Sequence, residues 1–117
     1  MTDREYLELA AKAAGIELRW HPDGTAYSDS RCKDYWGVWN PLTNDGDALR
    51  LAVKLAESAP GTHFTLSISK IHDGRGFADA GFFSHINPTE QVVGPDLAAA
   101  TRRAIVRAAA EIGRSMK

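Results

Sequence analysis

Residues 36–55 constrain the fold more strongly than any other stretch of the chain. The stretch opens with tryptophans and breaks at Pro41, which disfavours a helical backbone at the residue before it. Asn44 or Asp45 then offers a helix N-cap. The pattern beyond this cap predicts an amphipathic helix that ends at the Pro-Gly pair 60–61. Its predicted buried stripe consists of Leu49, Ala52, Val53 and Ala56, broadened by Leu51 and Leu55.

Two further helices are predicted near the two ends of the sequence. Thr2 and Glu5 fit a capping box, and Gly15 is placed to end the first helix in a left-handed cap. The last helix is predicted from about residue 95 or 96 to residue 114. Its predicted buried stripe consists of Leu97, Ala100 or Thr101, Ala104, Ile105, Ala108 and Ile112.

Alternating apolar residues predict a hairpin between the first two helices. Residues 16–20 alternate with period two, and the Pro-Asp-Gly sequence at 22–24 is a turn signal. A second strand near residues 25–28 is expected to pair back. Residues 29–34 are polar and predict a loop, whereas residues 35–39 fit either a strand or a cover for the edge of the core.

A second hairpin is predicted between the second and third helices. In residues 62–70 the side chains of Phe64, Leu66 and Ile68 alternate with hydroxyl residues, which predicts one buried and one wet face. A turn at residues 73–76 leads to a returning strand at 77–86, in which Gly81 is a candidate bulge. The whole order is α-ββ-α-ββ-α. We therefore expect a single α+β domain over residues 1–117, with a mainly antiparallel sheet and the helices packed on one face.

Composition narrows the function classes. The chain has 117 residues, a formal net charge of −1 and one cysteine, so it has no intrachain disulfide and no overall attraction to nucleic acid or anionic lipid. The beginning of the sequence is polar and predicts no signal peptide. No apolar run approaches the roughly 18 residues that span a bilayer. We expect a cytoplasmic protein that does not enter membranes.

The residues that carry metal or nucleophile chemistry are scattered. His63 and His72 flank one predicted strand and His85 lies on its partner, but none forms the tight local pair typical of zinc sites. Cys32 lies between two basic residues, which favours a thiolate, yet no neighbouring base completes a nucleophile. We therefore expect no catalytic residue, no metal site and no cofactor. A small Cys/His or metal-dependent enzyme is the second alternative.

Aromatic residues gather in one region and suggest a partner-binding surface. Tyr35, Trp36 and Trp39 would act as anchors where they are exposed and would form core where they are buried. Arg103 and Arg107 fall on one side of the last helix, where they predict either a solvated face or a contact for phosphates. Binding of nucleic acid or nucleotides is thus the first alternative. A homodimer through an edge strand or through the alanine-rich last helix is also expected to be feasible.

Two blocks of sequence resemble known proteins. The run from Trp39 to Leu55 and the closing segment 100–113 (Ala-Thr-Arg-Arg-Ala-Ile-Val-Arg-Ala-Ala-Ala-Glu-Ile-Gly) are similar to small bacteriophage and prophage proteins, distantly including the NinX-like group. Those proteins lack an established activity, so the resemblance implies a phage origin and a bacterial host cell rather than a mechanism. Small phage proteins without catalytic motifs often bind and disable host machinery. The expected function is therefore that of a phage-encoded accessory protein that binds a host or phage protein, with anti-CRISPR-like inhibition of a host defence complex as the form that this origin favours.

Overall fold

The computed structural model describes residues 2–32, 35–58, 64–71, 74–82 and 90–116, with the side chains of 29–32, 35, 36, 58 and 82 left undescribed. In these ranges the order is α-βββ-α-βββ-α, and every strand pair is antiparallel. The predicted α+β class is confirmed. The elements are α1 (Asp3–Ala14), β1 (Leu18–Trp20), β2 (Ala26–Cys32), β3 (Tyr35–Val38), α2 (Asp45–Ser58), β4 (Phe64–Lys70), β5 (Gly76–Phe82), β6 (Glu90–Gly94) and α3 (Leu97–Ser115).

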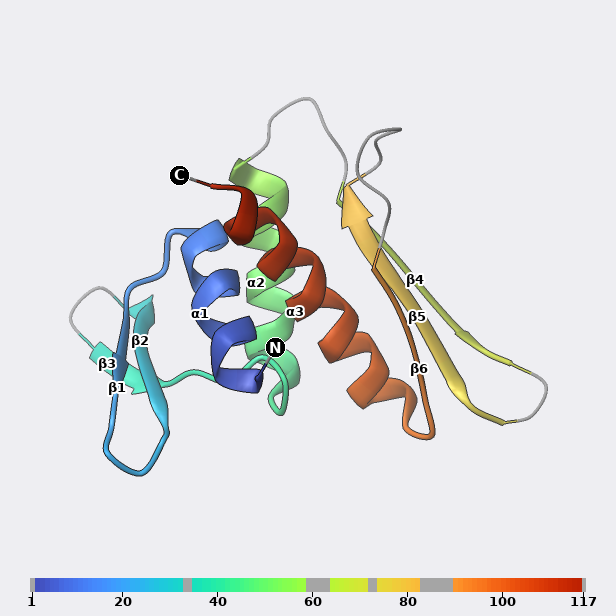
Figure 1. The fold of residues 1–117 in the computed structure, drawn as a ribbon, viewed down its shortest axis with the longest axis horizontal. Helices are drawn as coiled ribbons and strands as arrows, with labels where there is room; N and C mark the ends of the chain where they lie inside the picture. The colour runs from blue at the N-terminus through green and yellow to red at the C-terminus, as the bar shows by residue number, and fades with distance from the viewer. Residues whose placement is uncertain (1, 33–34, 59–63, 72–73, 83–89, 117) are drawn as a thin grey trace.

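The strands form two separate sheets with the helices between them. Sheet A has the order β1-β2-β3 and sheet B the order β4-β5-β6. Figure 1 shows sheet A on one side of the helical layer and sheet B on the other. The two predicted hairpins therefore each gain a third strand, and each becomes a sheet of its own.

Helix α3 is the central element of the described fold. It packs against α1, against α2 and against all three strands of sheet B. Such a position demands small side chains on several sides of the helix, and alanine supplies them at little cost in conformational entropy. Its buried residues are Ala100, Ala104, Ile105, Val106, Ala108, Ala109, Ala110 and Gly113.

The predicted ends of the first and last helices are confirmed. The Thr2 side chain accepts a hydrogen bond from the backbone N–H of Glu5, and Gly15 adopts the left-handed conformation with φ of 70°. The Asp96 side chain caps α3 by accepting from the N–H of Ala98 at 3.0 Å. Local side-chain chemistry thus fixes these boundaries.

Three strand predictions are wrong. The loop predicted at residues 29–34 is largely strand, because β2 continues to Cys32 and pairs there with Tyr35 of β3. Strand β6 was not predicted at all, and it forms by pairing with β5. Gly81 is no bulge, since it stands opposite Thr65 in an uninterrupted β4–β5 register. In each case pairing with a neighbouring strand outweighs the local composition.

Candidate binding surface on helix α2

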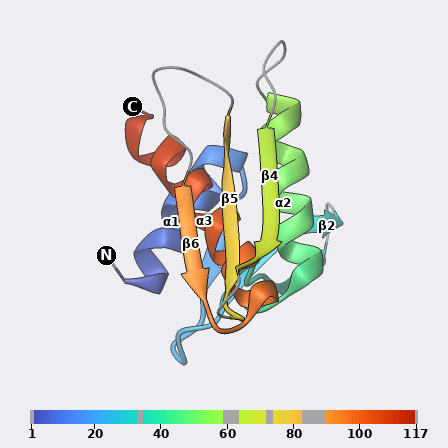
Figure 2. The ribbon, with the colours of Figure 1, turned by 90° about the vertical axis from the view of Figure 1, so that its right-hand side faces the viewer.

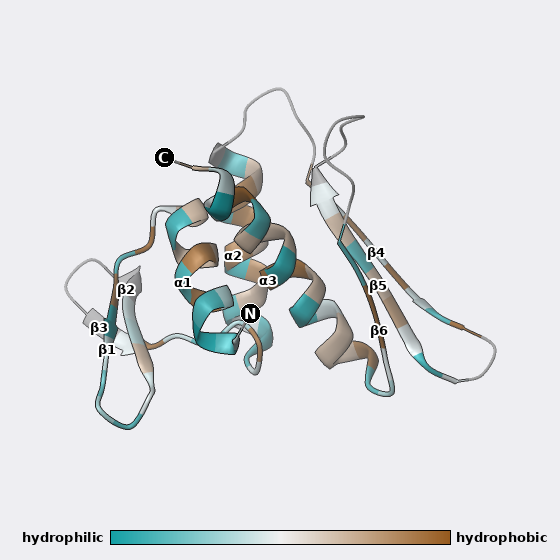
Figure 3. Ribbon diagram, in the orientation of Figure 1, coloured by the Kyte–Doolittle hydropathy of each residue, from teal (hydrophilic) through white to brown (hydrophobic). Residues whose placement is uncertain are grey.

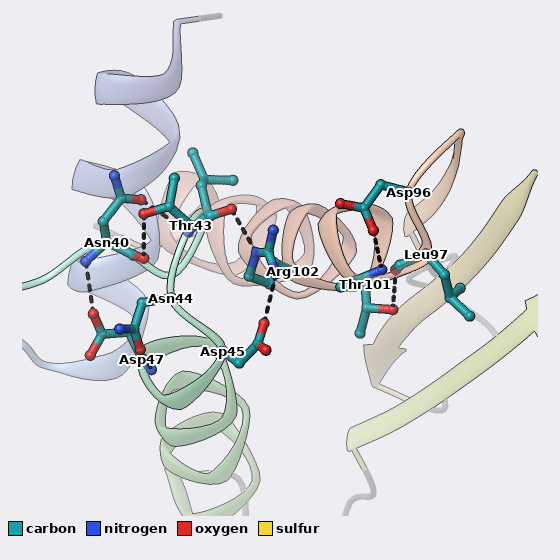
Figure 4. A network of polar contacts seen from close by, with 11 residues as sticks. Asn40, Thr43, Asn44, Asp45, Asp47, Asp96, Leu97, Thr101 and Arg102 are labelled. Atoms are coloured by element: carbon teal, nitrogen blue, oxygen red, sulfur yellow. Dashed lines mark hydrogen bonds and ion pairs between the residues drawn. The ribbon is translucent and has the colours of Figure 1, made fainter.

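A polar network holds the loop in front of α2 (Figure 4). The Asn40 side chain accepts from the backbone N–H of Leu42 at 3.0 Å. The Asn44 side chain accepts from the N–H of Asp47 at 2.9 Å, so Asn44 caps the helix. The Asp47 carboxylate, almost fully buried, accepts from the N–H of Asn40 at 3.0 Å and lies 2.6 Å from a guanidinium nitrogen of Arg50. These contacts close the loop onto the first turn of α2.

Arg102 ties the same loop to the central helix. Its Nε donates to the carbonyl of Leu42 at 2.8 Å, and its Nη1 lies 2.7 Å from Oδ1 of Asp45. The arginine is itself mostly covered, with 17% of its side chain exposed. The loop, the start of α2 and α3 are thereby joined at one place, which fixes the rotation of α2 about its own axis.

The face of α2 that this rotation buries differs from the predicted buried stripe. The fully buried face of α2 consists of Ala48, Leu51 and Leu55, whereas Leu49 is 65% and Val53 is 47% exposed. The predicted stripe of Leu49, Ala52, Val53 and Ala56 is therefore wrong in phase. Because α2 carries apolar residues on two faces, periodicity could not decide which face meets the core.

A hollow lies on one flank of the exposed face, and we call it the Trp39 hollow. It has a volume of about 260 Å³. Both apolar side chains and charged side chains of α2 line it. Its lining residues are Ile16, Trp39, Leu49, Arg50, Leu51, Val53, Lys54 and Glu57.

A larger hollow lies on the other flank, between α2, β4 and the start of α3, and we call it the β4 groove. It has a volume of about 430 Å³. Figure 2 shows α2 running beside β4 with α3 behind sheet B. Its lining residues are Asp45, Ala48, Leu49, Leu66, Ile68, Leu97, Ala98, Thr101, Arg102 and Ile105. Figure 3 shows apolar residues along both α2 and β4, which border this groove.

The structure separates the aromatic residues that were predicted to bind a partner. Trp39 is only 2% exposed and packs in the core, and it also lines the Trp39 hollow. Tyr35 and Trp36 lie in β3, directly before it in the chain, and their side chains are outside the described part of the structure. Trp20 packs against the core and lies under the guanidinium of Arg4, which is 4.4 Å from the ring centroid.

The predicted basic residues of α3 are paired with carboxylates. Arg103 lies 3.4 Å from Asp3, and Arg107 lies 3.5 Å from Glu90. Both arginines are partly exposed, at 40% and 37%. These partners cancel much of the positive charge that a phosphate would meet.

The residues considered for metal or nucleophile chemistry remain largely undescribed. His63, His72 and His85 lie outside the described residues, as does the side chain of Cys32. His21 is described, and its Nδ1 lies 3.2 Å from the carboxylate of Asp23. In the described ranges no three histidine, cysteine, aspartate or glutamate residues gather as metal ligands.

Within those ranges, no helix combines the length and the apolar character that crossing a bilayer requires.

The Asp23 carboxylate belongs to the turn between β1 and β2. It accepts a hydrogen bond from the backbone N–H of Thr25 at 2.9 Å. This bond, followed by the neighbouring His21, holds the pKa of Asp23 below its ordinary value. The group is exposed and serves the turn.

The residues that sequence reasoning missed are the exposed apolar ones. Leu49, Val53 and Ile68 were assigned to the core, and the structure leaves them 65%, 47% and 50% exposed. One signal was available in the sequence: α2 has more apolar residues than one helical face can bury. An excess of this kind indicates a second contact surface.

Comparison with known proteins gives no relative for this arrangement. The chain matches no protein-family model, no curated protein and no solved structure.

Proposed function

We propose that this chain acts by binding a partner protein at the Trp39 hollow and the exposed face of α2 beside it. The observation that carries the proposal is the exposure of Leu49 and Val53, one helical turn apart. The rotation of this helix is fixed by the Asn44 cap and by the contacts of Arg102 with Leu42 and Asp45. Large apolar side chains held in water in this way cost free energy unless a partner covers them.

The surface has the anatomy of a protein interface. Its lining combines apolar side chains with the charged side chains of Arg50, Lys54 and Glu57, as protein interfaces combine apolar and polar residues. Its volume of about 260 Å³ exceeds the roughly 150 Å³ of a cavity that accommodates a benzene ring. The hollow is therefore large enough to receive an aromatic or branched apolar side chain from the partner, which would serve as the anchor of the interface.

The origin of the partner is inferred from the sequence resemblance alone, and no contact within the molecule bears on it. A phage-encoded accessory protein would meet proteins of its bacterial host or of its own phage, and an inhibitor of a host defence complex is one such case. This step is an analogy between classes of protein. Binding and inhibiting a partner in this way requires no catalytic group on the surface described above.

A capture experiment with matched variants tests the proposal. The tagged protein is incubated with an extract of a bacterial host that carries the phage, and the bound proteins are quantified. Val53→Lys places a charge at the hollow, while Val93→Lys places the same charge on β6 at a residue of almost equal exposure, 46% against 47%. We expect a stoichiometric partner to bind the unmodified protein and Val93→Lys, and to fall at least about tenfold with Val53→Lys, as for loss of an interface anchor.

Two results would count against the proposal. Recovery of no stoichiometric partner is one, and equal recovery by Val53→Lys is the other.

The nucleic-acid alternative has less support, because Arg102, Arg103, Arg107 and Arg114 each lie within 3.5 Å of a carboxylate. Replacement of Arg103 and Arg107 by glutamate should therefore leave retention of DNA, RNA and nucleotides unchanged.

A further inference from the structure

Strand β4 presents an apolar face that the helices cover only in part. Leu66 and Ile68 stand opposite Ala80 and Ala78 of β5, so the four residues share one face of sheet B. The two alanines are completely buried, because α3 packs on β5 and β6. Leu66 remains 38% and Ile68 50% exposed at the edge of the β4 groove. The helices therefore cover this face of the sheet less completely at β4 than at β5.

The outer edge of β4 is also open. The order of sheet B places β4 at one end, and among the described residues no strand pairs with its other side. The strand is seven residues long, its register with β5 has no bulge, and it contains no proline. Residues 65–69 carry no charge. Natural edge strands are usually short, bulged, charged or covered, because an unprotected edge pairs with other strands.

The sequence of β4 is complementary to itself. In an antiparallel pair of two such strands with a two-fold axis at Ser67, Leu66 stands opposite Ile68 of the second copy. Thr65 then stands opposite Ser69, and each Ser67 opposite its equivalent. Apolar residues thus meet apolar residues on one face and hydroxyl residues meet on the other, with no like charges in opposition. A shift by one residue would place the apolar residues of one copy opposite the hydroxyl residues of the other.

We propose that a second copy of this chain occupies the open edge of β4, and that two copies of sheet B form one six-stranded antiparallel sheet about a two-fold axis at Ser67. Leu66 and Ile68 of both copies then form a continuous apolar stripe at the centre of the sheet, between the two copies of α2. This contact is isologous and closed, so assembly stops at the dimer. It does not depend on the partner proposed for the Trp39 hollow.

The mass of the purified protein in solution tests the dimer. Sedimentation or light scattering over a series of concentrations should give twice the 12.7 kDa of the chain. Ile68→Lys introduces a charge into the central stripe of each copy, and its mass should fall to that of one chain. Val93→Lys adds the same charge to β6, at the opposite edge of the same sheet, and should remain dimeric.

Cysteine cross-linking tests the register. In a Cys32→Ser background, Ser67→Cys brings two thiols directly opposite each other, with Cβ atoms about 5 Å apart, so mild oxidation should join two chains. Ser69→Cys is the matched control, because its two thiols would be offset by four residues, or about 13 Å, and should not join. A mixture of Thr65→Cys and Ser69→Cys chains should form the mixed disulfide.

Each result decides for or against the dimer. A single-chain mass at every concentration overturns it, as does a dimer that survives Ile68→Lys or a Ser69→Cys disulfide that forms as readily as that of Ser67→Cys. A single-chain protein whose β4 edge takes up a strand of a different protein also overturns it. Val53 lines the Trp39 hollow and Ile68 lines the β4 groove, so loss of the captured partner with Val53→Lys leaves the mass measurement unaffected.

Discussion

Gly113 of α3 lies directly against the backbone of Leu9 in α1. A Cβ atom at Gly113 would overlap the Leu9 carbonyl oxygen, and the three atoms nearest to it all belong to the Leu9 backbone. The two helices therefore approach each other more closely here than any larger residue allows. This close approach belongs to the packing of α1 against α3, which is the main contact that α1 makes with the other helices.

Gly113→Ala is expected to destabilise the protein. Alanine would favour the helix by about 1 kcal/mol over glycine. The overlap with a backbone atom outweighs this gain, because a carbonyl cannot rotate away as a side chain can. We expect a net loss of about 1–3 kcal/mol in the free energy of unfolding, measured by chemical denaturation. Gly94→Ala is the control, since no atom lies within 4 Å of its added Cβ, and it should change stability by less than about 1 kcal/mol. Equal effects of the two variants would contradict the close approach.

Arg102 and Arg103 are neighbours with unequal roles. Arg102 is mostly buried and donates to the Leu42 carbonyl, whereas Arg103 is 40% exposed and reaches an exposed Asp3 at 3.4 Å. Arg102→Ala should lower the free energy of unfolding by about 1–3 kcal/mol, mainly through the bond to the carbonyl. Arg103→Ala should cost less than about 1 kcal/mol, because water and salt screen its ion pair. Thermal or urea unfolding of the two variants side by side measures the difference, and the reverse order would refute it.

Asp47 is expected to matter more than Asp45, although both lie in the first turn of α2. Asp47 is buried and contacts the N–H of Asn40 and the guanidinium of Arg50. Its replacement by alanine leaves these groups without this acceptor, at a cost of about 2 kcal/mol. Asp45 is 81% exposed, so the corresponding alanine variant should lose less than about 1 kcal/mol. Denaturant midpoints of both variants provide the comparison, and a larger loss for Asp45 would exclude this assignment.

The Asp23 turn is predicted to weaken in acid. The folded pKa of Asp23 lies below its unfolded value, chiefly because of the hydrogen bond from the N–H of Thr25. The carboxylate therefore stabilises the turn fully above the unfolded pKa, and this contribution disappears as the pH falls through the folded pKa. NMR titration of the Asp23 side chain should give a pKa below that of an ordinary aspartate. Replacement of Asp23 by asparagine should remove the acid-dependent change in the Thr25 amide signal. An unshifted pKa would contradict the hydrogen bond.

The features that the sequence predicts correctly are local ones. The residues at helix ends satisfy or replace backbone hydrogen bonds within a few residues, so the sequence alone identifies them. They are Thr2, Gly15, Asn44 and Asp96. The second hairpin is predicted for the same reason, from side-chain alternation. Turn and cap residues bond to backbone groups only a few residues away, so a short stretch of sequence contains both partners.

The features that the sequence does not predict depend on distant neighbours. The phase of α2 is set by Arg102 through its contacts with Leu42 and Asp45, which lie 60 and 57 residues earlier in the chain. Strand β6 forms by pairing with the edge of β5, and its own residues show little alternation of apolar and polar side chains. Leu49 and Val53 therefore look like core in the sequence and form surface in the structure. The candidate site was missed for the same physical reason that the helix phase was.

The central position of α3 has a consequence for the order in which the molecule acquires its stability. While the chain is being synthesised, α1 and both sheets emerge before residues 97–115, yet α1 and sheet B share their main contacts with α3. The apolar surfaces of α1 and of sheet B therefore have no common cover until α3 has emerged. We expect chains that end before residue 97 to be degraded rapidly by proteases, because α1 and sheet B then lack the helix that both pack against.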